Sequence, residues 1–223
     1  MENLTIGIEG LVGAGKTSLC RELLKMIPNS ILLHGGNLYR GIIVALNSNK
    51  ELMENYFNKI VNIKELMDIL KVSIEIKNRE SIVLVDGKQI NEEDLQSDKI
   101  SLEVSKIAKD ANNEKLYEFA RKLIDLYKER YTVIISGRDL MKIYPSLDYH
   151  FFVTADLNER IKRKLKQYND ISKEELEKHI KLRDDLQRES GFYNKYEKTI
   201  EIDVTDCKNP EESAKKIFER INL

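Results

Sequence analysis

Gly10-Leu11-Val12-Gly13-Ala14-Gly15-Lys16-Thr17 is the stretch that decides the fold of this chain. Its spacing, G-x-x-x-x-G-K-T, is that of a phosphate-binding loop. The stretch directly follows an apolar run, Leu4–Ile8, and opens a helical pattern, Ser18–Met26. A phosphate-binding loop requires this order of strand, loop and helix, whereas a chance glycine-rich turn does not. We therefore predict that the chain binds a nucleoside triphosphate.

Each part of the stretch has a role in that prediction. The glycines let the backbone curl so that successive N–H groups point at phosphate oxygens, and the helix that follows adds the positive end of its dipole. Lys16 can reach the β- and γ-phosphates, and the hydroxyl of Thr17 can bind Mg²⁺. We expect ATP and Mg²⁺ as cofactors, and we place these residues at the nucleotide: Gly10, Gly13, Ala14, Gly15, Lys16, Thr17 and Ser18.

Composition narrows the class of protein. Lysine and arginine total 37 and aspartate and glutamate total 38, so a net charge of −1 does not favour a nucleic-acid partner. No apolar run approaches the roughly 18 residues of a membrane span. The N-terminus lacks the basic region and the cleavage site of a signal peptide. Cys20 and Cys207 lie far apart and suggest neither a disulfide nor a metal site. We expect a cytoplasmic protein without membrane contact.

Apolar runs and helical patterns alternate along the chain. Strands are expected at Leu4–Ile8, Ser30–Leu33, Thr132–Ser136, His150–Val153 and, more weakly, Thr199–Val204. Helices are expected at Leu38–Asn47, Glu51–Leu70, Ile100–Asp110, Glu114–Arg130, Leu157–Gln167, Lys173–Arg188 and Pro210–Ile221. This alternation predicts an α/β fold with a five-stranded parallel sheet that is covered by helices on both faces.

One segment departs from the alternation. Val72–Lys77 and Ile82–Asp86 each alternate apolar and polar residues, and Asn78–Ser81 between them indicates a turn. Lys88–Ile90 could supply a short third strand. We therefore expect a small antiparallel β insertion at about residues 64–97, within a single domain whose core comprises residues 1–63 and 98–223.

Arginines lie where such a sheet would deliver them to a ligand. A phosphoryl-transfer site must neutralise charge on the donor, the acceptor and the group in transfer, and arginine grips phosphate oxygens with two N–H groups at once. Arg138 and Asp139 follow the strand Thr132–Ser136, and Arg40 follows the strand Ser30–Leu33. The carboxyl ends of parallel strands form the ligand crevice. We predict site roles for all three, against the alternative of ion pairs or solvated faces.

Arg160 and Arg163 lie three residues apart and share one helical face, which Lys164 extends. This face could belong to a short lid, at about residues 157–170, that closes on phosphates; an exposed charged stripe is the alternative. Arg183-Asp184-Asp185 lies in a highly charged helix, where exposure to solvent is the default. Transfer to an anionic acceptor needs no general base, so positioning and electrostatics would carry the step.

The order of the later motifs resembles that of the bacterial cytidylate kinase family, whose members are nucleoside monophosphate kinases. The likeness runs from Ile6 to about Ile217. It rests on Glu9–Thr17, Gly36-Asn37-Leu38-Tyr39-Arg40, Gly137-Arg138-Asp139, Tyr144-Pro145, Glu159-Arg160 with Arg163, and Arg183-Asp184-Asp185. The phosphate-binding loop alone occurs in many unrelated proteins, but the order and spacing of the later motifs are much more specific. The predicted hairpin is also similar to that family's enlarged monophosphate-binding lobe.

The resemblance implies a role for each matching residue. Lys16 and Thr17 would hold the ATP phosphates and Mg²⁺. The implied catalytic residues are Lys16, Arg138, Arg160 and Arg163, the last two in the lid. The acceptor would be bound by Gly36, Tyr39, Arg40, Ser105, Arg138, Asp139 and Arg183.

Departures from the family's pattern all lie on the acceptor side. The family usually has Asp-Ser-Gly where this chain has His34-Gly35-Gly36, and an arginine where it has Glu114. The family also expects an aspartate and an arginine at the positions of Gln187 and Ser190. The donor side, by contrast, is intact.

The resemblance implies an ATP- and Mg²⁺-dependent kinase that phosphorylates a nucleoside monophosphate, CMP or dCMP first among them. Two alternatives stay open: a phosphotransferase of the same fold with a different small-molecule acceptor, and a nucleotide-binding regulatory protein without catalysis. Arg138, Arg160 and Arg163 favour an enzyme, because simple binding does not need so many cations for a transition state. We expect a monomer whose partner is its small-molecule substrate.

Overall fold

The computed structural model of the protein describes residues 2–47, 49–58, 60, 63–91, 95, 100, 114–166 and 171–222. The chain forms two compact units. Unit 1 comprises Met1–Leu32 and Tyr127–Leu223, and unit 2 comprises Leu33–Leu126. The chain passes from one unit to the other in β2 (Ser30–His34) and returns in α7 (Glu114–Lys128).

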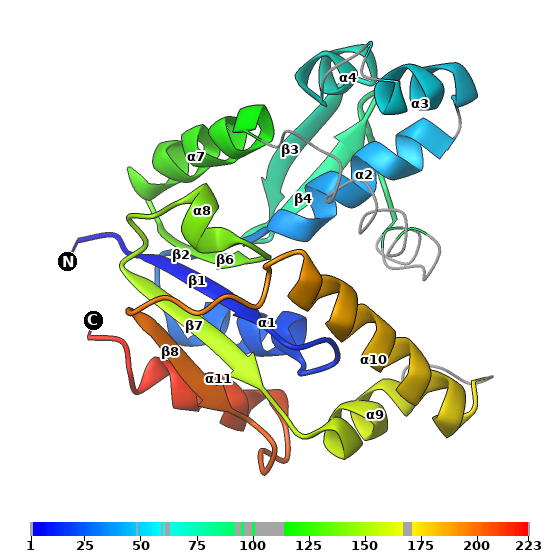
Figure 1. Ribbon diagram of the computed structural model, residues 1–223. Coiled ribbons are helices and arrows are strands. Elements are labelled where there is room, and N and C mark those ends of the chain that lie inside the picture. The colour runs from blue at the N-terminus through cyan, green and yellow to red at the C-terminus, as the bar shows by residue number, and fades with distance from the viewer. Residues whose placement is uncertain are drawn as a thin grey trace. The chain divides into compact units, whose positions relative to one another are not determined.

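Parallel strands form the centre of unit 1 (Figure 1). β1 (Thr5–Gly10) lies between β6 (Thr132–Ser136) and β7 (Tyr149–Thr154), β8 (Thr199–Asp203) pairs with the other edge of β7, and β2 lies beside β6. The β1–β6, β1–β7 and β7–β8 pairings are parallel. All six residues of β1 are buried. A central strand that is covered on both faces takes a nearly continuous apolar sequence, and this explains the run that precedes the phosphate-binding loop.

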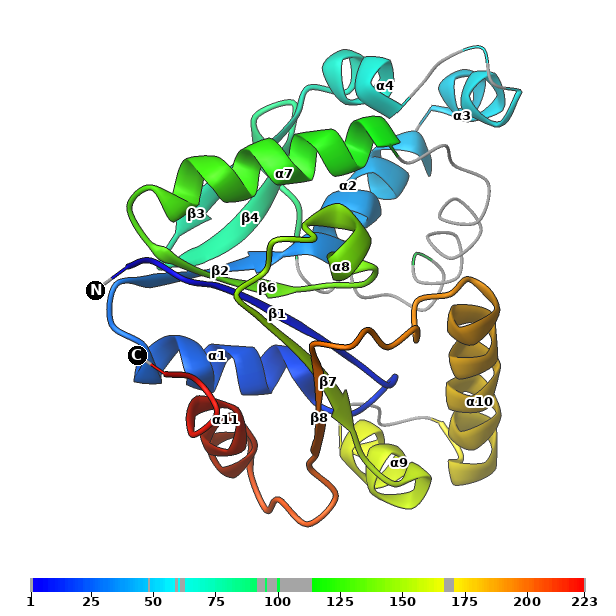
Figure 2. The ribbon, with the colours of Figure 1, turned by 60° about the vertical axis from the view of Figure 1, so that its left-hand side comes forward.

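Helices cover both faces of this sheet. α1 (Lys16–Met26) and α11 (Pro210–Phe218) lie side by side on one face, and α8 (Leu140–Ile143) lies on the other (Figure 2). The core between α1, α11 and the sheet contains Ile8, Leu23, Phe151 and Ile217, all fully buried. α9 (Leu157–Leu165) and α10 (Lys173–Glu189) pack against each other through a second apolar cluster, which Val12 of the phosphate-binding loop joins.

Local signals set the starts of these helices. At α10 the hydroxyl of Ser172 accepts from the N–H of Glu175, whose carboxylate accepts from the N–H of Ser172, and this reciprocal pair is a capping box. Asn209 caps α11, with Pro210 as its first residue. At α1, in contrast, Gly15 supplies no side-chain cap. The first N–H groups of α1 therefore suit an anion.

Unit 2 contains an antiparallel sheet of β3 (Val72–Lys77), β4 (Glu80–Val85) and β5 (Lys88–Gln89). α2 (Gly35–Asn47), α3 (Lys50–Phe57) and α4 (Ile63–Ile69) precede it in the chain. Ile42, Leu46, Leu66 and Met67 belong to a buried apolar cluster in this unit, against which residues of β3 pack. The unit thus has a core of its own.

The hairpin of β3 and β4 confirms the predicted antiparallel insertion, but its turn is shorter than expected. β4 begins at Glu80 rather than at Ile82. Asn78 and Arg79 have positive φ angles of 51° and 67° and close a two-residue turn, a geometry that matches the twist of the strands. Asparagine adopts a positive φ readily, whereas arginine seldom does. The sequence pattern therefore predicted a longer turn, over Asn78–Ser81.

Other boundaries differ by a few residues. The expected helix over Glu51–Leu70 is divided into α3 and α4, and α2 begins at Gly35, before the expected Leu38. The expected helix Ile100–Asp110 lies outside the described residues, Ile100 excepted. The predicted fold class is confirmed: a sheet of mainly parallel strands is flanked by helices and carries a small antiparallel insertion. Within the described residues, every helix is too short or too polar to cross a lipid bilayer.

Candidate active site

The phosphate-binding loop joins the end of β1 to the start of α1, as its sequence context predicted. Gly10, Gly13 and Gly15 have positive φ angles of 147°, 79° and 90°. At Gly10 an added β-carbon would lie only 2.1 Å from the carbonyl oxygen of Val153, so a side chain cannot fit between β1 and β7. The loop therefore needs its glycines for backbone conformation and for close packing alike.

Positive charges converge at the start of α1. Nζ of Lys16 donates to the carbonyl oxygens of Gly10 and Leu11, both at 2.8 Å, so the side chain folds back over the loop. Burial lowers the pKa of Lys16 well below its ordinary value, and the charges of Arg138 and Arg183 lower it further. Burial likewise lowers the pKa of Arg138, and Arg183 adds to that shift. The three predicted cations thus lie close enough in unit 1 to repel one another.

The turn after β6 carries two predicted site residues. Nε of Arg138 donates to Oε1 of Gln187 at 2.7 Å, and its Nη1 donates to the carbonyl oxygen of Gly137 at 2.9 Å. Asp139 is buried, with a positive φ of 57°, and its carboxylate lies 3.4 Å from Nζ of Lys142. The hydrogen bonds that orient Arg138 thus go to a neutral amide and to a backbone carbonyl.

A buried carboxylate fixes this turn to the end of β1. Oε1 of Glu9 accepts from the N–H of Leu140, the first residue of α8, at 2.5 Å. Oε2 of Glu9 lies 3.3 Å from Nε2 of His150, whose Nδ1 contacts the hydroxyl of Thr199 at 2.9 Å. Glu9 and His150 are only 2% and 0% exposed. Glu9 at the end of β1 therefore connects the phosphate-binding loop to the turn that follows β6.

Arg160 lies in α9 against the phosphate-binding loop, where it is buried. Its Nη1 donates to Oδ2 of Asp184 at 2.5 Å and to the carbonyl oxygen of Val12 at 3.0 Å. Its β-carbon lies 3.4 Å from the position that a β-carbon on Gly13 would occupy. In this structure the guanidinium binds protein groups, and its predicted catalytic role stays a prediction.

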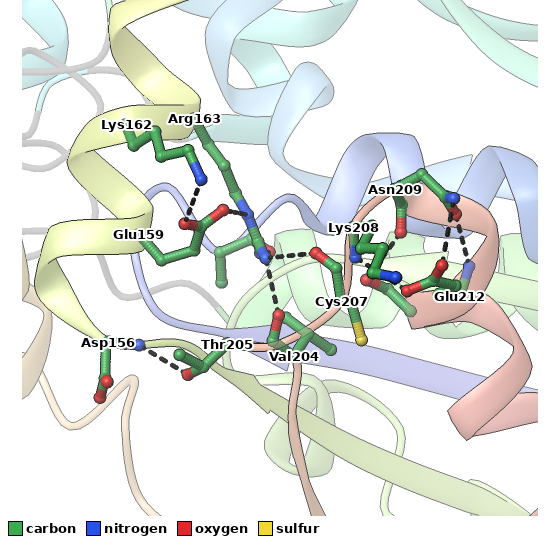
Figure 3. Close-up of polar contacts among 12 residues, drawn as sticks. Asp156, Glu159, Lys162, Arg163, Val204, Thr205, Cys207, Lys208, Asn209 and Glu212 are labelled. Atoms are coloured by element: carbon green, nitrogen blue, oxygen red, sulfur yellow. Dashed lines mark hydrogen bonds and ion pairs between the residues drawn. The ribbon is translucent and has the colours of Figure 1, made fainter.

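Arg163, one turn further along α9, is bound on all sides by acceptors (Figure 3). Its Nε donates to Glu159 and its Nη1 to the carbonyl oxygen of Ala14, both at 3.1 Å. Its Nη2 donates to the carbonyl oxygens of Val204 at 2.6 Å and Cys207 at 3.3 Å. The predicted shared face of Arg160 and Arg163 is thus the face that α9 turns to the phosphate-binding loop.

Predicted acceptor residues also occur in unit 2. Gly36, Tyr39 and Arg40 all lie in α2, Gly36 is exposed, and Arg40 is partly buried. Ser105 lies outside the described residues, and Glu114 is the first residue of α7. Their roles at an acceptor stay predictions, as does that of Arg183 in α10 of unit 1.

His34, the last residue of β2, contacts two residues of β4 in unit 2. Its N–H donates to the hydroxyl of Ser81 at 2.8 Å, and its Nε2 lies 2.9 Å from Oε2 of Glu80. The side chain is 9% exposed. At the other departures from the family's pattern, Gln187 contacts Arg138, and Ser190 donates its hydroxyl to the carbonyl oxygen of Leu186 at 2.8 Å. The side chains of His34, Gln187 and Ser190 therefore all have a polar partner in this structure.

Sequence reasoning missed Asp184 and Tyr193. The charged character of α10 suggested exposure, yet Asp184 is 6% exposed and accepts hydrogen bonds from the loop and from the hydroxyl of Tyr193. A signal was present, because Leu176, Ile180 and Asp184 follow one another at intervals of four and continue one buried stripe. Tyr193 carried no such signal.

The sequence model of one known family, described as cytidylate kinase, matches residues 6–223. The chain belongs to the cytidylate kinase family. It is 31% identical to a cytidylate kinase of Caldicellulosiruptor saccharolyticus, over 98% of this chain and 96% of the relative. It is 30% identical to a cytidylate kinase of Clostridioides difficile over the whole of both chains. Among solved structures, it is similar to TT1252 from Thermus thermophilus at 15% identity, with a TM-score of 0.46 over the whole of both chains.

Membership confirms the resemblance that the sequence motifs indicated. It also confirms the predicted enzyme class, a nucleoside monophosphate kinase. The strand, loop and helix of β1 and α1 are those of a nucleotide-binding kinase.

Proposed function

We propose that this protein transfers the γ-phosphoryl group of ATP to a nucleoside monophosphate, with CMP or dCMP as its preferred acceptor and Mg²⁺ as its metal. The carrying observation is that Lys16 folds back over the phosphate-binding loop, with Arg138 and Arg183 near enough to lower its pKa. Three cations that repel one another gain most from a ligand with many negative charges. A triphosphate donor beside a monophosphate acceptor is such a ligand.

The donor side can be assigned from the loop upward. Backbone N–H groups of the loop and of the first turn of α1 would cradle the β- and γ-phosphates, since no side chain caps that helix and its first turn holds no acidic residue. Lys16 would exchange the carbonyl oxygens of Gly10 and Leu11 for phosphate oxygens. A protonated lysine is required for this role, and the triphosphate itself would raise the pKa that burial lowers.

Mg²⁺ fits the residues at the start of α1. Thr17 is the second residue of that helix, and its hydroxyl oxygen is the type of ligand that Mg²⁺ prefers. Mg²⁺ in kinases keeps several waters and binds mainly to substrate phosphates, so one protein oxygen suffices. When bound, the ion would neutralise charge that develops between the β- and γ-phosphates.

The transfer itself needs positioned charges rather than a base. A phosphate oxygen of the acceptor attacks the γ-phosphorus, the bond from that phosphorus to the β,γ-bridging oxygen breaks, and ADP leaves with the bond's electrons. Arg138 and Arg183 would stabilise the charge on the transferred group and on the acceptor. Once the acceptor is also bound, Arg160 and Arg163 would join them by giving up the carbonyl and carboxylate partners that they hold in this structure. We therefore assign the segment at about 157–170 as a lid.

We further assign Gly36, Tyr39, Arg40 and Ser105 to the binding of the acceptor, with Asp139 facing the base, as the family resemblance implies. The segment at about 64–97 would form the lobe that covers the monophosphate. A monomer would suffice for this reaction.

One observation favours a second candidate, a small phosphorylated acceptor other than CMP. Gln187 stands where the family expects an aspartate, and it is the direct partner of Arg138. A neutral amide adds no negative charge beside Arg138, so the acceptor meets a more positive group than an aspartate at position 187 would leave, and this widens the range of anions that can bind.

An acceptor panel tests both candidates. Purified protein with ATP and Mg²⁺ is offered CMP, dCMP, UMP, AMP and GMP, with ADP formation as the readout and the Lys16→Met variant as the background control. We expect CMP or dCMP to give the highest kcat/KM. ATP binding in calorimetry without turnover of any nucleoside monophosphate would refute the first candidate and support the second.

A further inference from the structure

We infer that Asp184 is a positioning residue that holds Val12 and thereby sets the shape of the phosphate-binding loop. Oδ1 of Asp184 accepts from the N–H of Val12 at 3.2 Å. This hydrogen bond joins α10 to the phosphate-binding loop, which lies 172 residues earlier in the chain. The carboxylate is 6% exposed, so water does not compete for it.

The same carboxylate also acts on the carbonyl group of Val12, through Arg160. Oδ2 of Asp184 binds Nη1 of Arg160, and that same Nη1 donates to the carbonyl oxygen of Val12 at 3.0 Å. The N–H and C=O of Val12 are therefore both fixed by one buried ion pair. A loop residue that is held at both ends of its backbone cannot rotate without breaking the pair.

Apolar packing and a third hydrogen bond complete this arrangement. The side chain of Val12 is 4% exposed and packs with Ile161 of α9 and with Leu176 and Ile180 of α10. The hydroxyl of Tyr193 donates to Oδ1 of Asp184 at 2.6 Å, which orients the carboxylate. Burial raises the pKa of Tyr193, so its hydroxyl stays a donor.

The position of Val12 decides what these contacts do. Val12 directly precedes Gly13–Thr17, whose N–H groups would receive the donor phosphates. If Val12 turns, the N–H groups that follow it lose their common direction, and a cradle works only when its donors converge. The inference rests on the proposed binding of ATP by the loop, and it assigns Asp184 to the donor side without any contact to substrate.

The test compares ATP affinity by calorimetry, without acceptor, in the wild type, Asp184→Asn, Tyr193→Phe and Asp185→Asn. Asp185 is the matched control, because it neighbours Asp184 on α10 but is exposed and pairs with Arg188 at the surface. We expect Asp184→Asn to weaken ATP binding by about tenfold, the loss of roughly one charge-assisted hydrogen bond. Tyr193→Phe should weaken it by about threefold, and Asp185→Asn should leave it unchanged.

Steady-state kinetics supply a readout that a purely structural role would not move. The KM for ATP should rise in Asp184→Asn at temperatures where the variant is folded, while the KM for the acceptor stays within about twofold. A folded Asp184→Asn with wild-type ATP affinity would overturn the inference. If that variant does not fold, Tyr193→Phe decides, and wild-type affinity there overturns it too. Failure of the wild type itself to bind ATP would instead refute the proposed function.

Discussion

Replacing Lys16 by methionine should separate stability from catalysis. Methionine keeps an unbranched stem of similar length but lacks the charge, so the loop and the first turn of α1 lose only the ammonium group. In this structure the charged ammonium group is disfavoured, because burial and the charges of Arg138 and Arg183 lower its pKa. In the proposed reaction it would be the cation that follows the γ-phosphoryl group.

The two effects differ in size and in sign. The variant loses two hydrogen bonds from Nζ to the carbonyl oxygens of Gly10 and Leu11, each worth about 1.5 kcal/mol or somewhat more because the donor is charged, and water can replace part of that loss. Against this, it no longer holds a buried charge beside like charges, a penalty that reaches several kcal/mol for a fully buried ion. We therefore expect the free energy of unfolding to stay level or rise. Turnover should fall by about 10²–10³, which is roughly 3–4 kcal/mol of transition-state stabilisation.

Thermal unfolding and ADP-coupled turnover at saturating ATP measure the two effects. Lys25→Met, on the same helix but exposed and paired with Glu22, is the matched control and should change neither. The sign of the pH dependence follows from the lowered pKa of Lys16: between that value and the ordinary value of about 10.4 the unfolded chain binds more protons, so wild-type stability rises with pH there. Lys16→Met should lack this rise. A melting temperature lower by more than about 5 °C, or turnover within about tenfold of the wild type, would refute the reasoning.

Three further substitutions test other parts of unit 1. Gly10→Ala should abolish ATP binding and lower the melting temperature, because its β-carbon would meet the carbonyl oxygen of Val153 at 2.1 Å; unchanged calorimetric affinity would contradict this. Asp148→Asn should lower the free energy of unfolding by about 1 kcal/mol at pH 7. Partial burial opposes ionisation of Asp148, but hydrogen bonds from Thr5 and Lys128 outweigh it and lower the pKa of that carboxyl group. The unfolded chain then binds the proton first as pH falls, so the difference from wild type in urea unfolding should shrink below about pH 4, and a constant difference would contradict it. Arg163→Lys should lower the free energy of unfolding, measured in urea, by about 1–3 kcal/mol, because one ammonium group cannot reach the four acceptors of the guanidinium. Lys162→Arg, at the exposed neighbouring position, is the control and should leave the free energy of unfolding unchanged.

Local patterns predicted the parts of the fold that local physics decides. The phosphate-binding loop follows from glycine spacing between an apolar run and a helical pattern, and the structure places it between β1 and α1. The insertion follows from the period of two in β3 and β4. The turn between these strands was mispredicted, because it depends on an arginine in a left-handed conformation that neighbouring strands impose.

The partners of the site residues could not be predicted, because they come from distant parts of the chain. Nothing in the sequence near Arg138 points to Gln187, and nothing near Val12 points to Asp184. Helical spacing did predict that Arg160 and Arg163 share a face. What that face contacts depends on how α9 packs, and long-range packing leaves no local pattern.

The buried contact between Glu9 and His150 has a consequence for natural variation. Nε2 of the fully enclosed imidazole has no hydrogen-bond partner among the described residues, and the carboxylate of Glu9, at 3.3 Å, is the polar group that it faces. Loss of the long acidic side chain at position 9 would remove that neighbour and leave the buried nitrogen facing no charge. The reverse change would leave a buried carboxylate facing an empty space. We therefore expect positions 9 and 150 to change together among homologues, with histidine at 150 accompanying glutamate at 9. The pair would then mark a lineage within the family, independently of any residue that touches a nucleotide.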